Sequence, residues 1–256
     1  MIFSYSQIIT KPPEGLGVRL VSVGPLLFLG APAMVLAVMV ACNPVTLSPE
    51  DSTAHSFVQL HSQVQIIPTQ HTVRVQGHVA CTQGFLEQMV CGRGSREHES
   101  LVVIDAPASV VHAAMLAAGM RAGKPGSWHS ATDGVVQLVS PTGDVVQVLV
   151  QWQDETGEHQ APLSSWLINL SAGSTQPIFV FAGSAFVPNK QGAQRYLADD
   201  SGSVVGLVTF GDEVIAMREV VPDKVQVSAA RWKARTSVMP VEGAAVTVIL
   251  RAQHSP

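Results

Sequence analysis

The chain has 256 residues, of which 46% are hydrophobic, 13% charged and 5% aromatic, and its formal net charge is -4. A chain without a basic excess does not fit nucleic-acid binding, which needs a positively charged face. The apolar content argues against a disordered chain, and three cysteines are too few for a small disulfide-stapled scaffold. The composition therefore leaves a folded protein of one domain or two small ones.

The N-terminal region carries the strongest local signal. Residues 20–41 are almost wholly apolar and follow Lys11 and Arg19, which is the order of charged and hydrophobic regions in a secretory signal. The run ends in Val40-Ala41-Cys42, and small residues directly before a cysteine resemble the lipobox of bacterial lipoproteins, although Met39 stands where that motif usually has leucine. The resemblance implies cleavage before the cysteine and a diacylglycerol on its thiol.

Two other interpretations of residues 1–41 stay open, an uncleaved membrane anchor and an ordinary cleaved signal. The apolar run has the length of a membrane-spanning helix, for which ~20 residues suffice. Four helix-breaking residues disfavour a long uninterrupted helix: Gly24, Pro25, Gly30 and Pro32. The lipoprotein interpretation is preferred, and it places the protein in the cell envelope, attached to the membrane and facing the periplasm.

The next segment, residues 42–71, is predicted to be a flexible tether. Between Asn43 and Thr72 it holds only two charged residues, Glu50 and Asp51, and it is rich in Ser, Thr, Gln and His. We expect one folded domain to follow, from residue 72 to residue 256.

The folded domain is predicted to be rich in strands, because short β-branched runs with period-2 alternation are separated by turn residues. The predicted strands are 73–79, 85–91, 99–105, 135–139, 145–152, 178–186, 204–210 and 246–250, and 214–221 is compatible with either a strand or a helix.

Apart from the undecided segment 214–221, helices are predicted at two places. The clear one spans 107–118, with a proline near its start and Gly119 just past its end; it is apolar on nearly all sides and is therefore expected to be buried. A short helix is expected within 162–170. Because strands dominate without βαβ alternation, the predicted fold class is α+β, with a mainly antiparallel sheet and a few helices.

Several motifs of the domain recur together in one known family. They are Gly84-x-Leu86-Glu87-x-x-x-Cys91, Arg96-Glu97-His98-Glu99-Ser100, Val111-His112-Ala113 with Gly119, Phe179-Val180-Phe181-Ala182-Gly183-Ser184, and Tyr196-x-Ala198-Asp199. Over roughly residues 78–220 the chain resembles the YdjY-domain family of bacterial envelope proteins, which is abundant in planctomycetes. Members often carry Lys where Arg96 stands, which keeps the charge. The resemblance implies an envelope location and supplies no activity and no catalytic residues.

The densest polar segment of the chain runs from Arg96 to Ser100. Glu97, His98 and Glu99 are candidate catalytic residues, because a carboxylate there could do acid–base chemistry or bind a metal together with the histidine. The spacing is not H-E-x-x-H, which has two histidines one helical turn apart. No metal site and no cofactor is assigned to the chain.

A structural role for the same segment is the alternative. Three titratable residues that lead into an apolar strand are not all expected to be solvated, and a buried carboxylate must be paired, ligate a metal or stay protonated. We expect a polar network that joins Arg96 and Ser100, or the segment of Tyr196 and Asp199, to these residues. If the strand begins at Glu97, then Glu97 and Glu99 share one of its faces.

Two further residue types are expected to be structural. Cys91 lies eight residues beyond the turn centred on Gln83, some 25 Å along a strand at ~3.4 Å per residue, whereas bridged Cα atoms come within ~7 Å. Unless the strand bends sharply enough to allow a disulfide, Cys81 and Cys91 are therefore expected to be free thiols or packed side chains. His112, on the apolar helix, is more typical of a packed core histidine than of a ligand.

The sequence thus favours a membrane-anchored cell-envelope lipoprotein whose domain is a binding or scaffold module for an envelope protein or a small ligand. The alternative is an envelope hydrolase or metal-assisted enzyme centred on Glu97, His98 and Glu99. The two differ in geometry, because an enzyme needs these residues open to a pocket and a scaffold needs them buried and paired.

Overall fold

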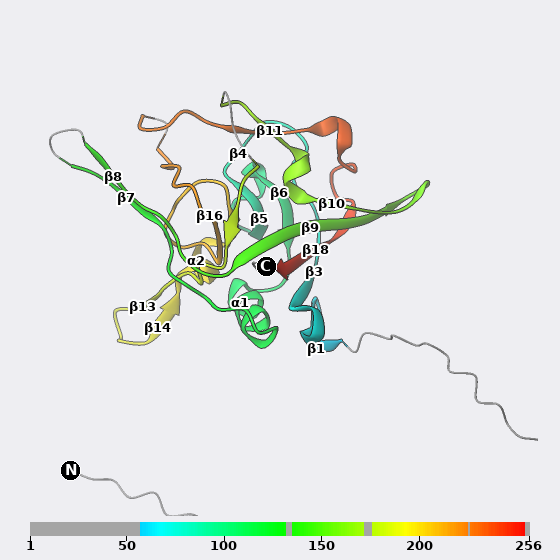
Figure 1. Cartoon of the computed structure of the whole chain (residues 1–256), viewed down its shortest axis with the longest axis horizontal. Helices are drawn as coiled ribbons and strands as arrows, with labels where there is room; N and C mark the ends of the chain where they lie inside the picture. The colour runs from blue at the N-terminus through cyan, green and yellow to red at the C-terminus, as the bar shows by residue number, and fades with distance from the viewer. Residues whose placement is uncertain (1–56, 132–134, 172–175, 225, 254–256) are drawn as a thin grey trace, which may run out of the picture. The chain divides into compact units, whose positions relative to one another are not determined.

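Eight strands close into a barrel in the computed structural model, which describes residues 57–131, 135–171, 176–224 and 226–253 (Figure 1). In order around the ring they are β3 (Thr72–Val79), β18 (Ala245–Ala252), β9 (Val145–Asp154), β12 (Phe179–Val180), β16 (Ile215–Met217), β15 (Ser203–Gly206), β5 (Gln88–Gly92) and β6 (Ser100–Ile104), and β6 pairs with β3 again. The pairs β5–β6 and β15–β16 are parallel, and the other pairs of the ring are antiparallel.

The predicted α+β fold is wrong, because the closed barrel makes this a mainly β protein. Within the described residues there are two α-helices, α1 (Ala108–Ala117) and the short α2 (Leu197–Ser201). The closure rests on a pairing of β3 with β6 that no local pattern encodes, and several strands are too short to show a period. The sequence therefore indicated strands without indicating how they join.

One edge of β3 is shared between two partners, and this division closes the ring. Residues 72–75 of β3 pair with β2 (Val64–Ile67), whereas Gly77, His78 and Val79 pair with β6. At the changeover, a Cβ on Gly77 would lie 2.5 Å from the carbonyl oxygen of Val103. Only glycine allows β6 to approach this closely, as is typical where a backbone packs against another at a barrel corner.

The strands next to the closure are buried on both faces. All residues of β6 and β15 are buried, and so are the first four residues of β5. These strands therefore appear in the sequence as continuous apolar runs, as expected where the interior of the ring is filled and its outer side is covered.

The folded region begins earlier than the predicted boundary at residue 72. The strands β1 (Val58–His61) and β2 and the short 3-10 turn η1 (Pro68–Gln70) extend the sheet from β3, and Val64 and Ile66 are buried in the core. Residues 58–70 are predicted as part of the tether because they are rich in Ser, Thr, Gln and His and lack the periodic apolar pattern that a core element needs. The rest of the predicted tether up to residue 56, and Cys42 with it, lies outside the described residues.

Smaller elements cover the barrel. A three-stranded sheet lies beside the ring and consists of β11 (Leu167–Asn169), β17 (Trp232–Ala234) and β4 (Phe85–Leu86). Two strand pairs accompany it, β7 (Ser127–Ser130) with β8 (Val136–Val139) and β13 (Phe186–Pro188) with β14 (Gln194–Tyr196), and strand β10 (Gly157–Pro162) pairs with β9. The 3-10 turns are η2 (Glu97–Glu99), η3 (Leu163–Trp166) and η4 (Thr236–Val238). The short helix expected within 162–170 is η3 followed by β11, and the long strand expected over 178–186 is the two-residue β12 followed by a loop.

The predicted helix over 107–118 is confirmed as α1, but it is not buried on all sides. It buries Ala108, Val111, Ala114 and Met115 and leaves Leu116 exposed, together with Ala113 and Ala117. In the described ranges, no helix combines the length and the apolar character that crossing a bilayer requires.

A pair of substitutions tests whether β1 and β2 belong to the folded domain. Ile66→Ala removes a buried side chain and should lower the free energy of unfolding by about 2–4 kcal/mol. The control Leu60→Ala changes an exposed residue of the neighbouring strand and should stay within about 0.5 kcal/mol. Urea denaturation measures both, and equal small effects would place this segment outside the core.

Candidate functional site

Two glutamates meet at the amino ends of the parallel strands β5 and β6. The register pairs Gln88 with Ser100, so the residues directly before them, Glu87 and Glu99, lie side by side. The backbone N–H of Glu87 donates to the carbonyl oxygen of Glu99 at 3.0 Å. The parallel pairing thus brings together two carboxyl groups that are twelve positions apart in the sequence.

The Glu87 carboxyl group titrates near neutral pH. Partial burial raises the pKa of Glu87 to about 7, and the charge of Glu99 and a side-chain hydrogen bond with it raise this pKa as well. Asp223 adds to the repulsion, whereas Arg96 lowers the same pKa. Burial is therefore the main reason that the Glu87 carboxyl group holds its proton up to near neutral pH, and repulsion from Glu99 and Asp223 adds to it.

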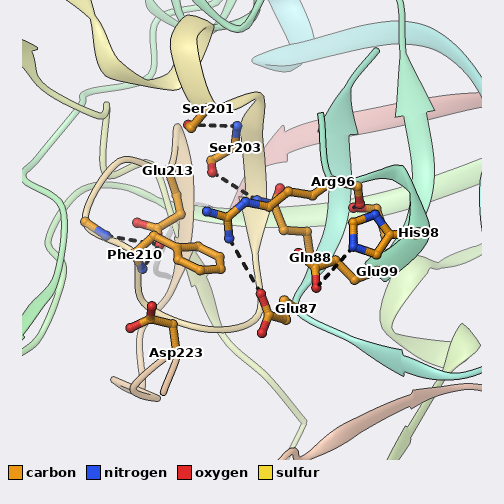
Figure 2. Close-up of polar contacts among 12 residues, drawn as sticks. Glu87, Gln88, Arg96, His98, Glu99, Ser201, Ser203, Phe210, Glu213 and Asp223 are labelled. Atoms are coloured by element: carbon orange, nitrogen blue, oxygen red, sulfur yellow. Dashed lines mark hydrogen bonds and ion pairs between the residues drawn. The ribbon is translucent and has the colours of Figure 1, made fainter. Parts of the chain in front are cut away.

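Arg96 is held between an aromatic ring and a carboxylate (Figure 2). Its guanidinium carbon lies 3.6 Å from the centroid of the Phe210 ring, and its Nη1 lies 3.5 Å from Oε2 of Glu87. A planar guanidinium is suited to this combination, since it stacks on an aromatic face and still donates from its edge.

The loop that carries Phe210 connects β15 to β16 and is fixed by a buried glutamate. Oε1 of Glu213 accepts hydrogen bonds from the backbone N–H groups of Phe210 at 2.5 Å and Gly211 at 3.3 Å. Its Oε2 has no hydrogen-bond partner in the described part of the chain. Burial raises the pKa of Glu213 to about 7.

A small pocket of about 110 Å³ opens beside the glutamate pair. Glu87, Glu99 and Asp223 line it with carboxyl groups. Its other lining residues are mainly apolar or small, with one arginine: Phe85, Leu86, Val208, Val221, Pro222, Ser228, Ala229, Ala230 and Arg231. Segments distant in the sequence therefore build one acidic pocket with apolar walls.

Asp223 links this pocket to the hairpin of β7 and β8. Its Oδ1 accepts a hydrogen bond from Nε1 of Trp128 in β7 at 3.0 Å. The ammonium group of Lys224 lies 5.4 Å from the centre of the same indole ring. The indole thus orients one of the three carboxyl groups of the pocket.

The run from Arg96 to Ser100 is divided between different roles. Glu97 accepts a hydrogen bond from the backbone N–H of Gly94 at 2.6 Å, and His98 is 81% exposed. Glu99 lines the pocket, and Ser100 donates its hydroxyl hydrogen to the carbonyl oxygen of Arg96 at 2.6 Å. The run forms the turn η2, and β6 begins only at Ser100, so the expected sharing of one strand face by Glu97 and Glu99 does not occur.

Tyr196 and Asp199 belong to a second cluster, around α1 and α2. The hydroxyl of Tyr196 lies 2.7 Å from Nδ1 of His112 and donates to the carbonyl oxygen of Gly183 at 3.1 Å. Burial raises the pKa of Tyr196 and lowers that of His112. Asp199 accepts from the backbone N–H of Ser109 at 2.8 Å, in the first turn of α1. The structure thus brings Arg96, Ser100 and Glu99 together and places Tyr196 and Asp199 elsewhere.

The two cysteines of the domain are free thiols, as the strand geometry led us to expect. Cys91 is buried in β5, and burial raises the pKa of its thiol. Neither cysteine lines the acidic pocket.

The sequence analysis missed Glu87, Phe210, Glu213 and Asp223 as members of the site. Glu87 stood in a motif that carried the family resemblance, but its closeness to Glu99 follows only from the parallel register. The other three lie in the loop before β16 and the segment after it, where no local pattern marks a polar role. No group of three metal-ligating side chains occurs in the described ranges.

The comparison with protein families identifies the domain. The model of the YdjY domain matches residues 58–251. The chain belongs to the YdjY-domain family. The match begins at β1 and ends within β18, so this YdjY domain includes the complete ring and the two strands before it. No curated protein and no solved structure matches the chain.

The buried Glu213 predicts a pH dependence of stability for the YdjY domain. Its pKa rises from an ordinary value of 4.5 to about 7 on folding, so between these pH values the folded state holds a proton that the unfolded state has lost. The free energy of unfolding should therefore fall as pH rises from about 4.5 to 7, by on the order of 3 kcal/mol from this residue.

Glu213→Gln keeps an acceptor for the two N–H groups and cannot ionise, so this part of the fall should disappear. Urea denaturation at pH 5 and pH 8 measures the difference, with Glu97→Gln as the control. An equally steep fall in Glu213→Gln would show that Glu213 does not carry a raised pKa.

Proposed function

We propose that this YdjY-domain protein is a cell-envelope lipoprotein, anchored through Cys42, whose barrel domain binds a cationic group of a small ligand or an envelope partner. The observation that carries the binding part is the apolar-walled pocket with three carboxyl groups, from Glu87, Glu99 and Asp223. Such a site combines a few polar groups that fix orientation with apolar walls, as ligand sites commonly do.

The charges around the pocket favour a cation. Arg96 is paired with Glu87, and Arg231, which also lines the pocket, lies 2.7 Å from Glu219. Arg96 thus pairs with one of the three acidic lining residues, and Arg231 pairs with a carboxylate outside the lining. An ammonium or guanidinium group in the pocket would favour the ionised form of Glu87, since an opposite charge close by lowers a carboxyl pKa.

The walls and the size of the pocket favour a short aliphatic amine. Leu86, Val208 and Val221 supply apolar surface beside the carboxyl groups, and about 110 Å³ accommodates only a few non-hydrogen atoms. The tip of a lysine side chain or the amine end of a small envelope compound has this chemistry.

Titration with n-butylamine tests the pocket, with n-butanol as the uncharged probe of similar shape. Binding of the amine, followed by NMR shifts of the glutamate carboxyl carbons, should tighten as pH rises from about 6 to 8, because Glu87 ionises in this range. Glu99→Gln and Asp223→Asn should weaken binding.

Glu97→Gln is the matched control, because that carboxyl group bonds to the Gly94 backbone and does not line the pocket. Equal binding of butanol and butylamine, or an equal loss in the control variant, would contradict the cation site.

The anchor is proposed from the sequence, in which an apolar run ends in Val40-Ala41-Cys42. Radiolabelled palmitate should be incorporated into the wild-type protein and not into Cys42→Ser, because the thiol is the only attachment point in this motif. Label that persists in the variant would contradict lipidation at Cys42.

A hydrolase is the second candidate, and the pKa of Glu87 is the observation that favours it. Two neighbouring carboxyl groups of which one titrates near pH 7 resemble an acid–base pair. In this alternative Glu87 and Glu99 act, rather than the exposed His98. For a hydrolase, Glu87→Gln should abolish turnover of an amine-bearing substrate while the variant still binds it. For a binding module, the wild-type protein itself should show no turnover.

A further inference from the structure

The first strand of the domain presents apolar side chains to solvent. Phe57, which precedes β1, is 60% exposed, and Val58 and Leu60 of β1 are 54% and 45% exposed. Strand β1 ends the hydrogen-bonded order of the large sheet and pairs with β2 in the described residues. Exposed apolar edge strands invite association, and soluble proteins usually protect them with charges or bulges. Here the register of the β1–β2 pair shifts between Gln59 and His61, but the edge carries no charged side chain.

The helix α1 lies beside this strand and also exposes apolar side chains. It contacts β1, β2 and β3, and Figure 1 shows α1 close to β1 at the same side of the domain. Its Leu116 is 48% exposed and lies between the exposed positions Ala113 and Ala117. We call the exposed residues of β1 and α1, with Phe57, the apolar face.

The sequences that build the apolar face carry no formal charge. Residues 52–73 and 106–120 contain no Asp, Glu, Lys or Arg, although the whole chain has 19 acidic residues. In the sequence, Glu50 and Asp51 directly precede the first of these segments. At the start of α1, Asp105 pairs with Arg93 and Asp199 accepts from the backbone N–H of Ser109. Beyond the end of α1, the side chain of Arg121 is 88% exposed, and it pairs with Asp144.

Histidines are the titratable groups of this surface. His61 ends β1, and His112 lies on α1 with its ring against Tyr196 and Phe181. The imidazole of His71 lies 2.7 Å from the carbonyl oxygen of Ala118, next to the end of α1. A neutral or cationic histidine is compatible with an anionic lipid surface, whereas a carboxylate is repelled by it.

The apolar face lies where the chain leaves its proposed anchor. Fifteen positions separate Cys42 from Phe57. Even fully extended, they span at most about 50 Å, at ~3.3–3.6 Å per residue. A lipid on Cys42 would thus keep β1 within about 50 Å of the bilayer surface. Such tethering raises the local concentration at which a weak apolar contact with the membrane can form.

We propose that the apolar face docks on the bilayer surface, so that the barrel lies against the membrane that anchors it. This inference rests on the proposed anchoring at Cys42. Phe57, Val58, Leu60 and Leu116 would enter the boundary of headgroups and acyl chains, as the apolar sides of interfacial elements do. The outer backbone edge of β1 would stay at headgroup level, where water and lipid headgroups satisfy its polar groups.

The test uses the full-length lipidated protein in vesicles of phosphatidylethanolamine and phosphatidylglycerol. The environment-sensitive dye NBD is attached to Leu60→Cys or Leu116→Cys in a Cys81→Ser background, because Cys91 is buried and Cys42 carries the lipid. Val241→Cys is the control, because Val241 is 78% exposed but lies away from β1 and β2. Its neighbours Gly243 and Ala244 form backbone hydrogen bonds with Val79 at the C-terminal end of β3, whereas β2 pairs with the N-terminal end.

Docking predicts blue-shifted emission and quenching by spin-labelled lipid for the dye at positions 60 and 116, and neither effect at position 241. Leu60→Asp should abolish the quenching at position 116. Flotation of the same vesicles reports the anchor separately. Protein that floats with unquenched dye at positions 60 and 116 would overturn docking and leave the anchor intact, and protein that does not float would overturn both.

A concentration-dependent blue shift without vesicles would assign the apolar face to a second copy of the chain and would also overturn the proposal.

Discussion

The division of one edge of β3 between β2 and β6 is the constraint on which the rest of the structure depends. Gly77 makes it possible, because any side chain there would collide with the backbone of β6. With β3 on one edge, β6 accepts β5 as a parallel neighbour on the other. That parallel register brings Glu87 beside Glu99, so the candidate site follows from the way the barrel closes.

The acidic pocket illustrates how this protein accommodates charge in a largely apolar chain. The guanidinium of Arg96 stacks on the Phe210 ring and forms an ion pair with Glu87. Glu213 accepts hydrogen bonds from two backbone N–H groups of the loop that carries this ring. Neither arrangement neutralises all the carboxyl groups, because both Glu87 and Glu213 keep a pKa of about 7. A buried charged group without a partner of opposite charge or enough hydrogen bonds destabilises the fold. At Glu87 the pocket leaves room for a ligand that supplies the missing positive charge.

The sequence predicted what depends on local pattern. The helix over 107–118 and the buried strand before it carry their own periodicity and turn residues, and both are present as α1 and β6. The segment 58–67 alternates as a strand does, yet its many polar residues made it look like a tether. The sequence could not predict barrel closure or the meeting of Trp128 with Asp223, since these join residues brought together by folding alone. The polar run at 96–100 was noticed, but only the parallel register shows that Glu99 faces Glu87 and that His98 faces solvent.

The central claim is that the barrel is closed and that its strand register positions the pocket. Cross-strand nuclear Overhauser effects between β3 and β6 test it most directly. Closure predicts contacts between the backbones of His78 and Val103 and of Gly77 and Ile104, together with contacts between Gln88 and Ser100 in the parallel pair. Contacts from β3 to β2 and β18 alone, with none to β6, would show an open sheet and would contradict the barrel. Absence of the contacts between Gln88 and Ser100 would contradict the origin of the acidic pocket.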